Sequence, residues 1–103
     1  MRFEWSDEKN QQNLRKHGVS FETAKQVFDD PALSVRERVV DGEERWQTMG
    51  LIDSVVVLLV AHTYREEDDA EIVRVISARK ATRNERKAYD KNYKESIEGN
   101  RKT

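Results

Sequence analysis

The chemistry open to this sequence rests on basic and aromatic side chains, because it has no cysteine and only two histidines. Lys16 and His17 close a predicted helix, and Arg79 and Lys80 stand where a predicted strand meets the last helix. Histidine can give and take a proton near neutral pH, and arginine offers a bidentate fork to phosphate oxygens. Such a set suits cleavage of RNA, whose 2′-hydroxyl attacks the neighbouring phosphate once a base takes its proton.

Each signal also has a structural explanation. Basic groups at the C-terminal end of a helix complement its dipole, and for Lys16 and His17 this is the favoured explanation on sequence alone. Arg74 interrupts an apolar strand, so it either faces a cleft or partner or protects a strand edge from aggregation. Tyr89 is of the type that usually packs a helix, and His62 is of the type that is packed or hydrogen-bonded in a core.

Arg45 lies on a predicted middle strand beside Trp46. Successive side chains of a strand point to opposite faces. Trp46 is expected in the core rather than as a platform for a base, so Arg45 is expected on the opposite face.

Metal and cofactor chemistry find little support. Two histidines without converging carboxylates do not predict a metal site, and the sequence has no Gly-rich phosphate loop. The acidic run at residues 66–69 lacks the spaced ligands and the glycine of a calcium loop. No cofactor or metal is therefore expected.

Length and charge set the outer limits. The chain has 103 residues, which predicts one domain over residues 1–97, with residues 98–103 as a frayed tail. Residues 1–71 carry 9 Lys and Arg against 16 Asp and Glu, and residues 72–103 carry 10 against 4. The basic C-terminal third suits a polyanion, although a solvated helix explains it equally well. No signal-peptide core or membrane-length apolar run is present, so a soluble cytoplasmic protein is expected.

The N-terminal part predicts a short strand at residues 3–5 and two helices. Ser6 is a candidate N-cap, and the first helix is expected to end at Gly18, which readily takes a left-handed conformation. A second helix begins at Ser20 and stops before Pro31.

The middle predicts an antiparallel sheet. Leu33, Val35 and Val39 are expected on one face of a strand, which turns at Asp41-Gly42 into a return strand over residues 44–50. A second turn near residues 53–54 leads into the apolar run at residues 55–61, expected as a central strand covered on both faces. An acidic loop at residues 65–71 then precedes a strand at residues 72–77.

The last element is a helix that starts near Thr82, where Thr82 and Glu85 match a capping box. The expected fold is therefore α+β: a small antiparallel sheet of about four strands, packed with two N-terminal helices and one C-terminal helix.

Three blocks of the chain resemble the BrnT toxins of bacterial type II toxin–antitoxin systems, in family order over roughly residues 3–93. The blocks are Phe3-Glu4-Trp5 with Asn13 to Phe21, Ala24 and Val27 to Pro31; Glu43 to Trp46 with Gly50; and Arg74 to Thr82 with Glu85-Arg86 and Tyr89.

The resemblance implies a RelE-like fold and an endoribonuclease activity that arrests translation. It also implies a partner, a BrnA-type ribbon–helix–helix antitoxin. This antitoxin would form a heterotetramer with the toxin and carry it to operator DNA. The RNA itself would be the substrate.

Carried onto this sequence, the resemblance nominates His17 for proton transfer, Arg74 and Arg79 for phosphate charge, and Lys16 as an assistant. The residues nominated for RNA binding are Arg45, Lys80 and Tyr89. Strict strand alternation puts Arg74 and Arg79 on opposite faces. A shared site therefore requires Ala78 to begin a turn.

Two rivals stay open. One is a non-catalytic module that binds nucleic acid or an antitoxin and acts in operon repression, although no helix-turn-helix pattern is present. The other is a toxin that has lost cleavage. A nuclease loses its toxicity when one critical charge is removed, whereas a simple binder is harmless throughout.

Overall fold

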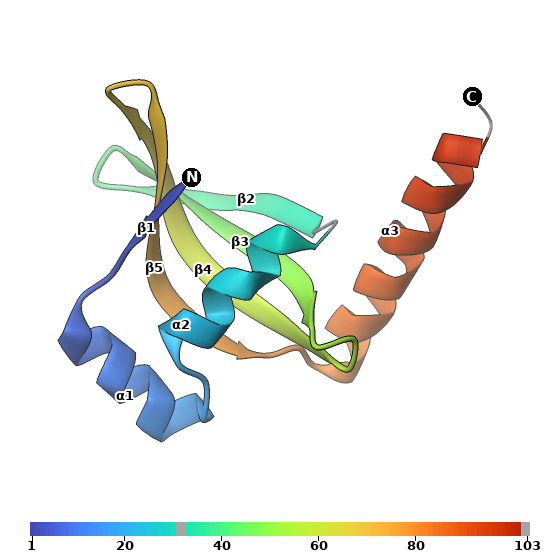
Figure 1. Ribbon diagram of the computed structural model, residues 1–103, viewed down its shortest axis with the longest axis horizontal. Coiled ribbons are helices and arrows are strands. Elements are labelled where there is room, and N and C mark those ends of the chain that lie inside the picture. Colours follow the sequence, from blue (N-terminus) through green and yellow to red (C-terminus); the bar gives the residue numbers. More distant parts are fainter. Residues whose placement is uncertain (31–32, 102–103) are drawn as a thin grey trace.

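A five-stranded mixed sheet, in the order β1-β5-β4-β3-β2, organises the chain (Figure 1). The computed structural model describes residues 1–30 and 33–101, and residues 33 and 94–101 by their backbone alone. The expected α+β fold is confirmed, with β1 added to the antiparallel strands by parallel pairing with β5. The elements are β1 (Arg2–Glu4), α1 (Asp7–His17), α2 (Phe21–Ala24), the 3₁₀ helix η1 (Lys25–Asp29), β2 (Leu33–Val40), β3 (Glu43–Ile52), β4 (Val56–Glu67), β5 (Ala70–Lys80) and α3 (Arg83–Arg101).

Both predicted ends of α1 are confirmed. The Ser6 hydroxyl accepts a hydrogen bond from the Lys9 backbone N–H, and Gly18 takes a left-handed φ of 70°. The second helix begins at its predicted cap, Ser20, but tightens into η1 after Ala24. Gly50 of β3 permits this packing, because a Cβ there would lie 2.6 Å from the Val27 carbonyl oxygen.

Tight hairpins join β2, β3, β4 and β5. The predicted turns at Asp41-Gly42 and at Asp53-Ser54 are confirmed, and all four residues have positive φ. The predicted acidic loop at residues 65–71 is wrong, because β4 and β5 run on to a two-residue turn at Asp68-Asp69. Aspartate tolerates the left-handed conformation that such turns require, so the acidic run forms a hairpin tip.

The expectation that Val35 and Val39 share a face is wrong. Glu37 is an extra residue in β2 that interrupts the pairing between Arg36 and Arg38. An unpaired residue reverses the side-chain alternation beyond it. Val35 and Val39 therefore lie on opposite faces, and both are more than half exposed on this edge strand.

A second bulge lies in β5. Ala61 pairs with Ser77 and His62 pairs with Val75, so Ile76 has no partner on β4. The strand continues to Lys80, and the turn at Ala78 that a shared arginine site would have required does not form. The alternation nevertheless changes phase at Ile76, because two residues of β5 oppose one of β4.

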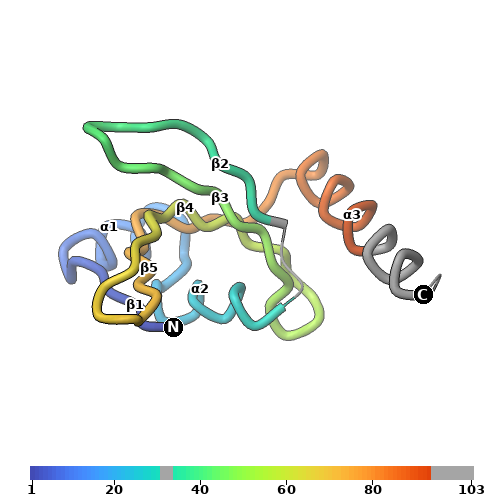
Figure 2. Tube along the Cα trace, turned by 90° about the horizontal axis from the view of Figure 1, so that it is seen from above, coloured from blue at the N-terminus to red at the C-terminus, as the bar shows by residue number. Residues whose placement is uncertain are grey.

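Two apolar clusters cover the two faces of β4, which confirms the predicted central strand, although Val55 lies outside it. The larger cluster lies between the sheet and α2 and η1, and its buried members are Val19, Phe21, Ala24, Val27, Ile52, Leu58, Val60, Val73, Val75 and Ala78. The smaller one lies on the other face beside α3. In Figure 2 the β2–β3 hairpin bends away from the side that α2 covers.

The capping box predicted for α3 is confirmed. The Thr82 backbone N–H donates to Glu85 Oε1 over 2.8 Å, and the Glu85 N–H donates to Thr82 Oγ1 over 3.2 Å. No helix in the described part of the chain is long and apolar enough to span a membrane. The fraying expected for residues 98–103 falls partly on residues 102–103, outside the described residues, and stays a prediction.

The side chain of Asn13 attaches α1 to the edge of β5. Pairing with β1 ends at Arg74, so the following part of this β5 edge has no neighbouring strand among the described residues. The Asn13 amide donates to the Ala78 carbonyl over 2.8 Å and to the Val19 carbonyl over 2.9 Å, and its oxygen accepts from the Ala78 N–H over 3.0 Å. Asn13 is 6% exposed. The buried Asn13 amide thus satisfies the Ala78 backbone groups that a neighbouring strand would otherwise bond.

We expect Asn13→Ala to lower the free energy of unfolding by about 3 kcal/mol, because it leaves three buried backbone groups without partners. Chemical denaturation measures the loss. Gln12→Ala, an exposed change in the same helix turn, is the control and is expected to change stability by less than about 0.5 kcal/mol. Equal stability of the two variants would contradict this role for Asn13.

Candidate active site

The bulge at Ile76 brings the two nominated arginines of β5 to one face of the sheet. Arg74 pairs with Thr63 and Arg79 pairs with Leu59, and both partners lie on the face of β4 opposite to the one that α2 and η1 cover. Regular alternation would have separated the two arginines. The shared placement that the sequence required is therefore present, through a bulge and not through a turn.

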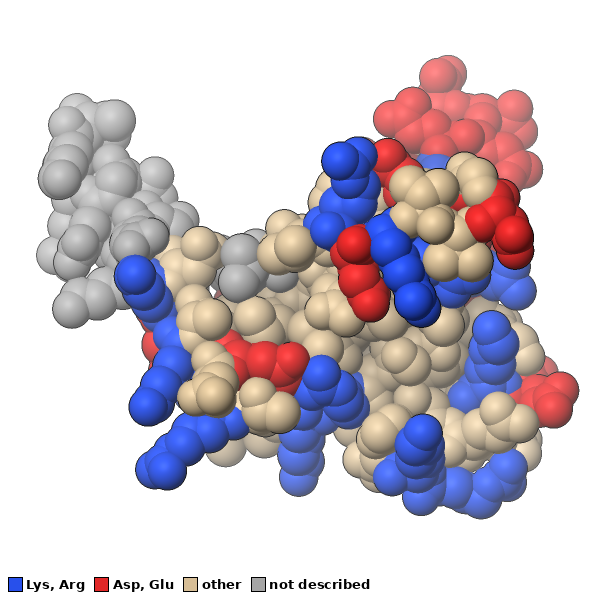
Figure 3. Space-filling view, turned by 180° about the vertical axis from the view of Figure 1, so that it is seen from behind, with Lys and Arg blue, Asp and Glu red and all other residues tan. Residues whose placement is uncertain are grey.

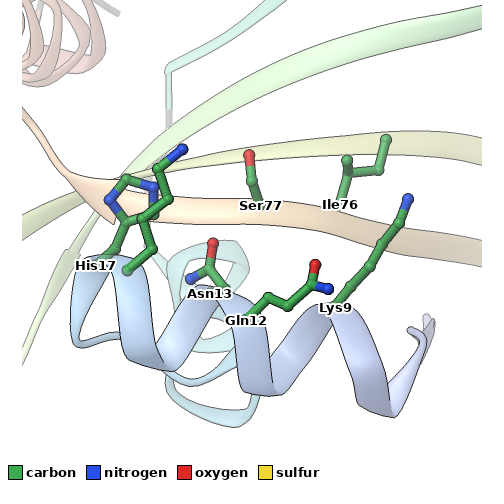
Figure 4. Close-up of a pocket in the computed structure, with 7 residues that line it drawn as sticks. Lys9, Gln12, Asn13, His17, Ile76 and Ser77 are labelled. Carbon is green, nitrogen blue, oxygen red and sulfur yellow. The ribbon is translucent and has the colours of Figure 1, made fainter.

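The C-terminal end of α1 lies beside the same stretch of β5. Lys16 and His17 line an open pocket of roughly 210 Å³ together with Ile76 and Ser77. Figure 4 shows Asn13 beneath Ser77, with His17 and Lys9 at opposite ends of the pocket. Lys16 is exposed and His17 is partly buried. The pocket therefore places an imidazole and ammonium groups beside the strand that carries Arg74 and Arg79.

Arg79 is held by a carboxylate of α3. Its Nη1 lies 2.7 Å from Glu85 Oε1 and its Nη2 lies 3.0 Å from Glu85 Oε2, a bidentate pair. The hydrogen bonds from Arg79 lower the pKa of Glu85 to about 2. Glu85 thus caps α3 and fixes the Arg79 guanidinium at the same time. Both Nη groups of Arg79 therefore already donate hydrogen bonds to Glu85.

The residues nominated for RNA binding are dispersed. Arg45 shares the face of Arg74, because Thr63 lies between the two in the register. Lys80 pairs with Leu58 of the larger cluster and so lies on the other side of the sheet from Arg79. The roles of Arg45 and Lys80 in binding stay predictions.

Tyr89 is 3% exposed and belongs to the smaller cluster. Its hydroxyl donates to the Asp30 carboxylate, which also accepts from the Leu51 N–H over 2.9 Å. Burial, followed by the Asp30 contact, raises the pKa of Tyr89. These contacts support a packing role that anchors α3 to β3 and η1.

His62 is packed inside the sheet, as expected. Its Nδ1 donates to the Thr63 carbonyl over 3.2 Å, and its Nε2 lies 2.7 Å from Thr48 Oγ1. Burial lowers the pKa of His62 and so favours the neutral ring. Within residues 1–30 and 33–101, no group of three or more His, Asp or Glu is placed to hold a metal ion.

Comparison with known proteins decides the family. The family model described as "Ribonuclease toxin, BrnT, of type II toxin-antitoxin system" matches residues 5–85. This chain belongs to the BrnT family. The match contains the α1 end, β5 and Glu85, and it ends before Tyr89.

The fold of this BrnT-family chain is similar to that of a solved relative. The crystal structure of the Brucella abortus ribonuclease toxin BrnT superimposes with a TM-score of 0.63 at 21% identity, over 81% of this chain and 99% of that one. No curated protein matches the chain.

Two residues that position the site in this BrnT-family chain had no direct sign in the sequence. Asn13 was part of a recognised block, but its partner Ala78 is 65 residues away. A usable signal existed: Leu14 is the only apolar residue of α1, and it is half exposed. A helix with so little apolar surface must be attached by polar contacts. Glu85 was recognised as a cap, but not as the partner of Arg79.

We expect Glu85→Ala to lower the free energy of unfolding at pH 7 by about 1–2 kcal/mol, through loss of the cap and of the pair with Arg79. Folding lowers the pKa of Glu85, so its contribution is complete above the ordinary carboxyl pKa. The contribution is lost as the pH falls toward about 2.

Denaturation of wild type and variant from pH 7 to pH 2 measures this difference, which should shrink on acidification. Glu22→Ala removes an exposed carboxylate paired with Lys25 and is the control. A difference that stays constant across this pH range would rule out the proposed linkage.

Proposed function

We propose that this BrnT-family protein is a metal-independent endoribonuclease that cleaves RNA at the β5 edge beside α1 and thereby inhibits translation. The observation that carries the proposal is the bulge at Ile76. Because of it, Arg74 and Arg79 lie on one face of β5, while Lys16 and His17 line the adjoining pocket.

In the reaction, the 2′-hydroxyl oxygen bonds to the adjacent phosphorus and the bond from phosphorus to the 5′-oxygen breaks. His17 exchanges protons with the reacting oxygens, since imidazole can act as both base and acid. Arg74 and Lys16 stabilise the additional negative charge of the phosphorane. The products are a 2′,3′-cyclic phosphate and a 5′-hydroxyl.

Arg79 contributes positive charge from a fixed position. Glu85 holds its guanidinium in a bidentate pair, so little side-chain entropy is lost when phosphate binds. The same carboxylate partly neutralises Arg79. We therefore assign Arg74 the larger share of charge stabilisation.

The partner that we propose is a BrnA-type ribbon–helix–helix antitoxin, which neutralises the toxin in a heterotetramer and carries it to operator DNA. Membership of a type II family supports a protein antitoxin. Its ribbon–helix–helix class and the four-chain assembly rest on the resemblance of the sequence blocks.

Incubation of the purified protein with a mixed-sequence RNA oligonucleotide in excess EDTA tests the proposal. We expect cleavage with cyclic-phosphate ends, and none where the nucleotide at the mapped site is 2′-deoxy. His17→Ala and Arg74→Ala should each slow cleavage by at least about 100-fold. Arg36→Ala removes an exposed arginine on the other face of β2 and should cleave like wild type.

Folding of each variant is checked by thermal unfolding, and growth arrest on induced expression is followed in parallel. A folded wild type that cleaves no RNA and does not arrest growth would refute the nuclease and leave a binding module or an inactive toxin. Cleavage that stops in EDTA and returns with Mg²⁺ would refute metal independence.

A further inference from the structure

A row of side chains crosses the sheet on the face opposite to the one that α2 and η1 cover. The register aligns Arg38 of β2, Arg45 of β3, Thr63 of β4, Arg74 of β5 and Glu4 of β1. Neighbouring strands are about 4.8 Å apart, so the backbones at Arg38 and Arg74 are separated by roughly 14 Å. Three arginines therefore lie on one line at right angles to the strands.

Arg45, the middle one of the three arginines, lacks a close anionic partner. Its side chain is 30% exposed, and its nearest carboxylate contact is at 3.9 Å, to Glu43. Its Nε is buried without a hydrogen-bond partner among the described residues. A buried donor without an acceptor costs free energy, so the Arg45 side chain would gain from a rearrangement that gave its Nε an oxyanion as acceptor.

The acid at one end of the line does little to reduce its positive charge. Glu4 is bound by Arg65 over 2.6 Å, and this contact lowers the pKa of Glu4 and compensates its charge locally. Arg38 and Arg74 form no ion pair within the described part of the chain. Figure 3 shows this face, with an uncharged centre surrounded by Lys and Arg side chains that are interspersed with Asp and Glu side chains.

We propose that Arg38, Arg45 and Arg74, which we call the arginine row, bind the phosphates of a single RNA strand that crosses the sheet toward the β5 edge. Several arginines along one line suit the repeated phosphates of one backbone, whereas a compact anion would use only one of them. The inference rests on the proposed function, because it gives the path by which substrate reaches that site. Arg38 and Arg45 are binding residues away from the reacting bond.

The bulge in β2 supplies a matched control. Arg36 and Arg38 are two positions apart, but Arg36 pairs with Trp46 and Arg38 pairs with Arg45. The two arginines therefore lie on opposite faces of the same hairpin. Arg36 is bound by Glu44 over 3.1 Å and is outside the arginine row.

The test measures the dissociation constant of wild type, Arg38→Ala, Arg45→Gln and Arg36→Ala for a fluorescent 2′-O-methyl RNA. This RNA keeps its phosphates but has no attacking hydroxyl. We expect Arg38→Ala and Arg45→Gln each to weaken binding about tenfold, as for one charge-assisted hydrogen bond. The slope of log K against log salt should fall in magnitude by about 0.7 for each lost phosphate contact. Arg36→Ala should bind like wild type.

Equal binding by Arg38→Ala and Arg36→Ala would overturn the row, as would a wild type that binds no RNA. Unchanged RNA binding with lost neutralisation by the antitoxin would overturn it too, and would assign this face to the protein partner. Arg38 is exposed on the edge hairpin, so its variant carries the test if Arg45→Gln unfolds. Cleavage is measured separately. If the variants bind RNA as expected but the wild type does not cleave it, the nuclease proposal is refuted and the arginine row is supported.

Discussion

The hydrogen bonds between Asn13 and Ala78 are the contact on which the candidate site depends. They connect α1 to β5 where β1 has ended, and α1 has almost no apolar surface with which to attach itself. The position of Lys16 and His17 relative to β5 is therefore set by an amide that both donates and accepts. A carboxylate at residue 13 would accept from the Ala78 N–H but could not donate to the carbonyls when ionised.

The bulge at Ile76 lies beside this contact and has a different effect. Its extra residue shifts the phase of β5, so that the strand presents Arg74 and Arg79 on one face while Val75 and Ala78 both remain in the larger cluster. Strand bulges commonly redirect side chains in this way near functional sites. This one inserted residue therefore keeps Val75 and Ala78 in the core and also places the two arginines on the same face.

Local signals in the sequence predicted much of the fold. Ser6, Gly18 and the Thr82–Glu85 pair act within a few residues of the chain, so their physical consequences could be read directly. The bulges were missed, because an extra residue breaks alternation without any distinctive residue type. The hairpin turn at Asp68-Asp69 was predicted as a loop because the segment is strongly acidic. Aspartate nevertheless tolerates the positive φ that a tight turn requires.

The site was predicted less completely than the fold. The basic residues were identified by type, whereas their grouping depends on long-range register that no local pattern contains. Tyr89 illustrates the difference: it is buried in the smaller cluster and its hydroxyl contacts Asp30, 59 residues away. Residue types thus predicted a chemistry, whereas the relative positions of the groups that would perform it are visible only in the folded sheet.

The acidic tip of the β4–β5 hairpin has a consequence at longer range. It concentrates negative charge at one end of a sheet whose exposed face carries the arginine row. A polyanion approaching from solution is repelled at the tip and attracted along the row, so the electric field orients it before any contact forms. Such steering acts over about 10 Å in 0.1 M salt and weakens as salt is added. The hairpin tip thereby influences the orientation in which a polyanion approaches the sheet, without contacting it.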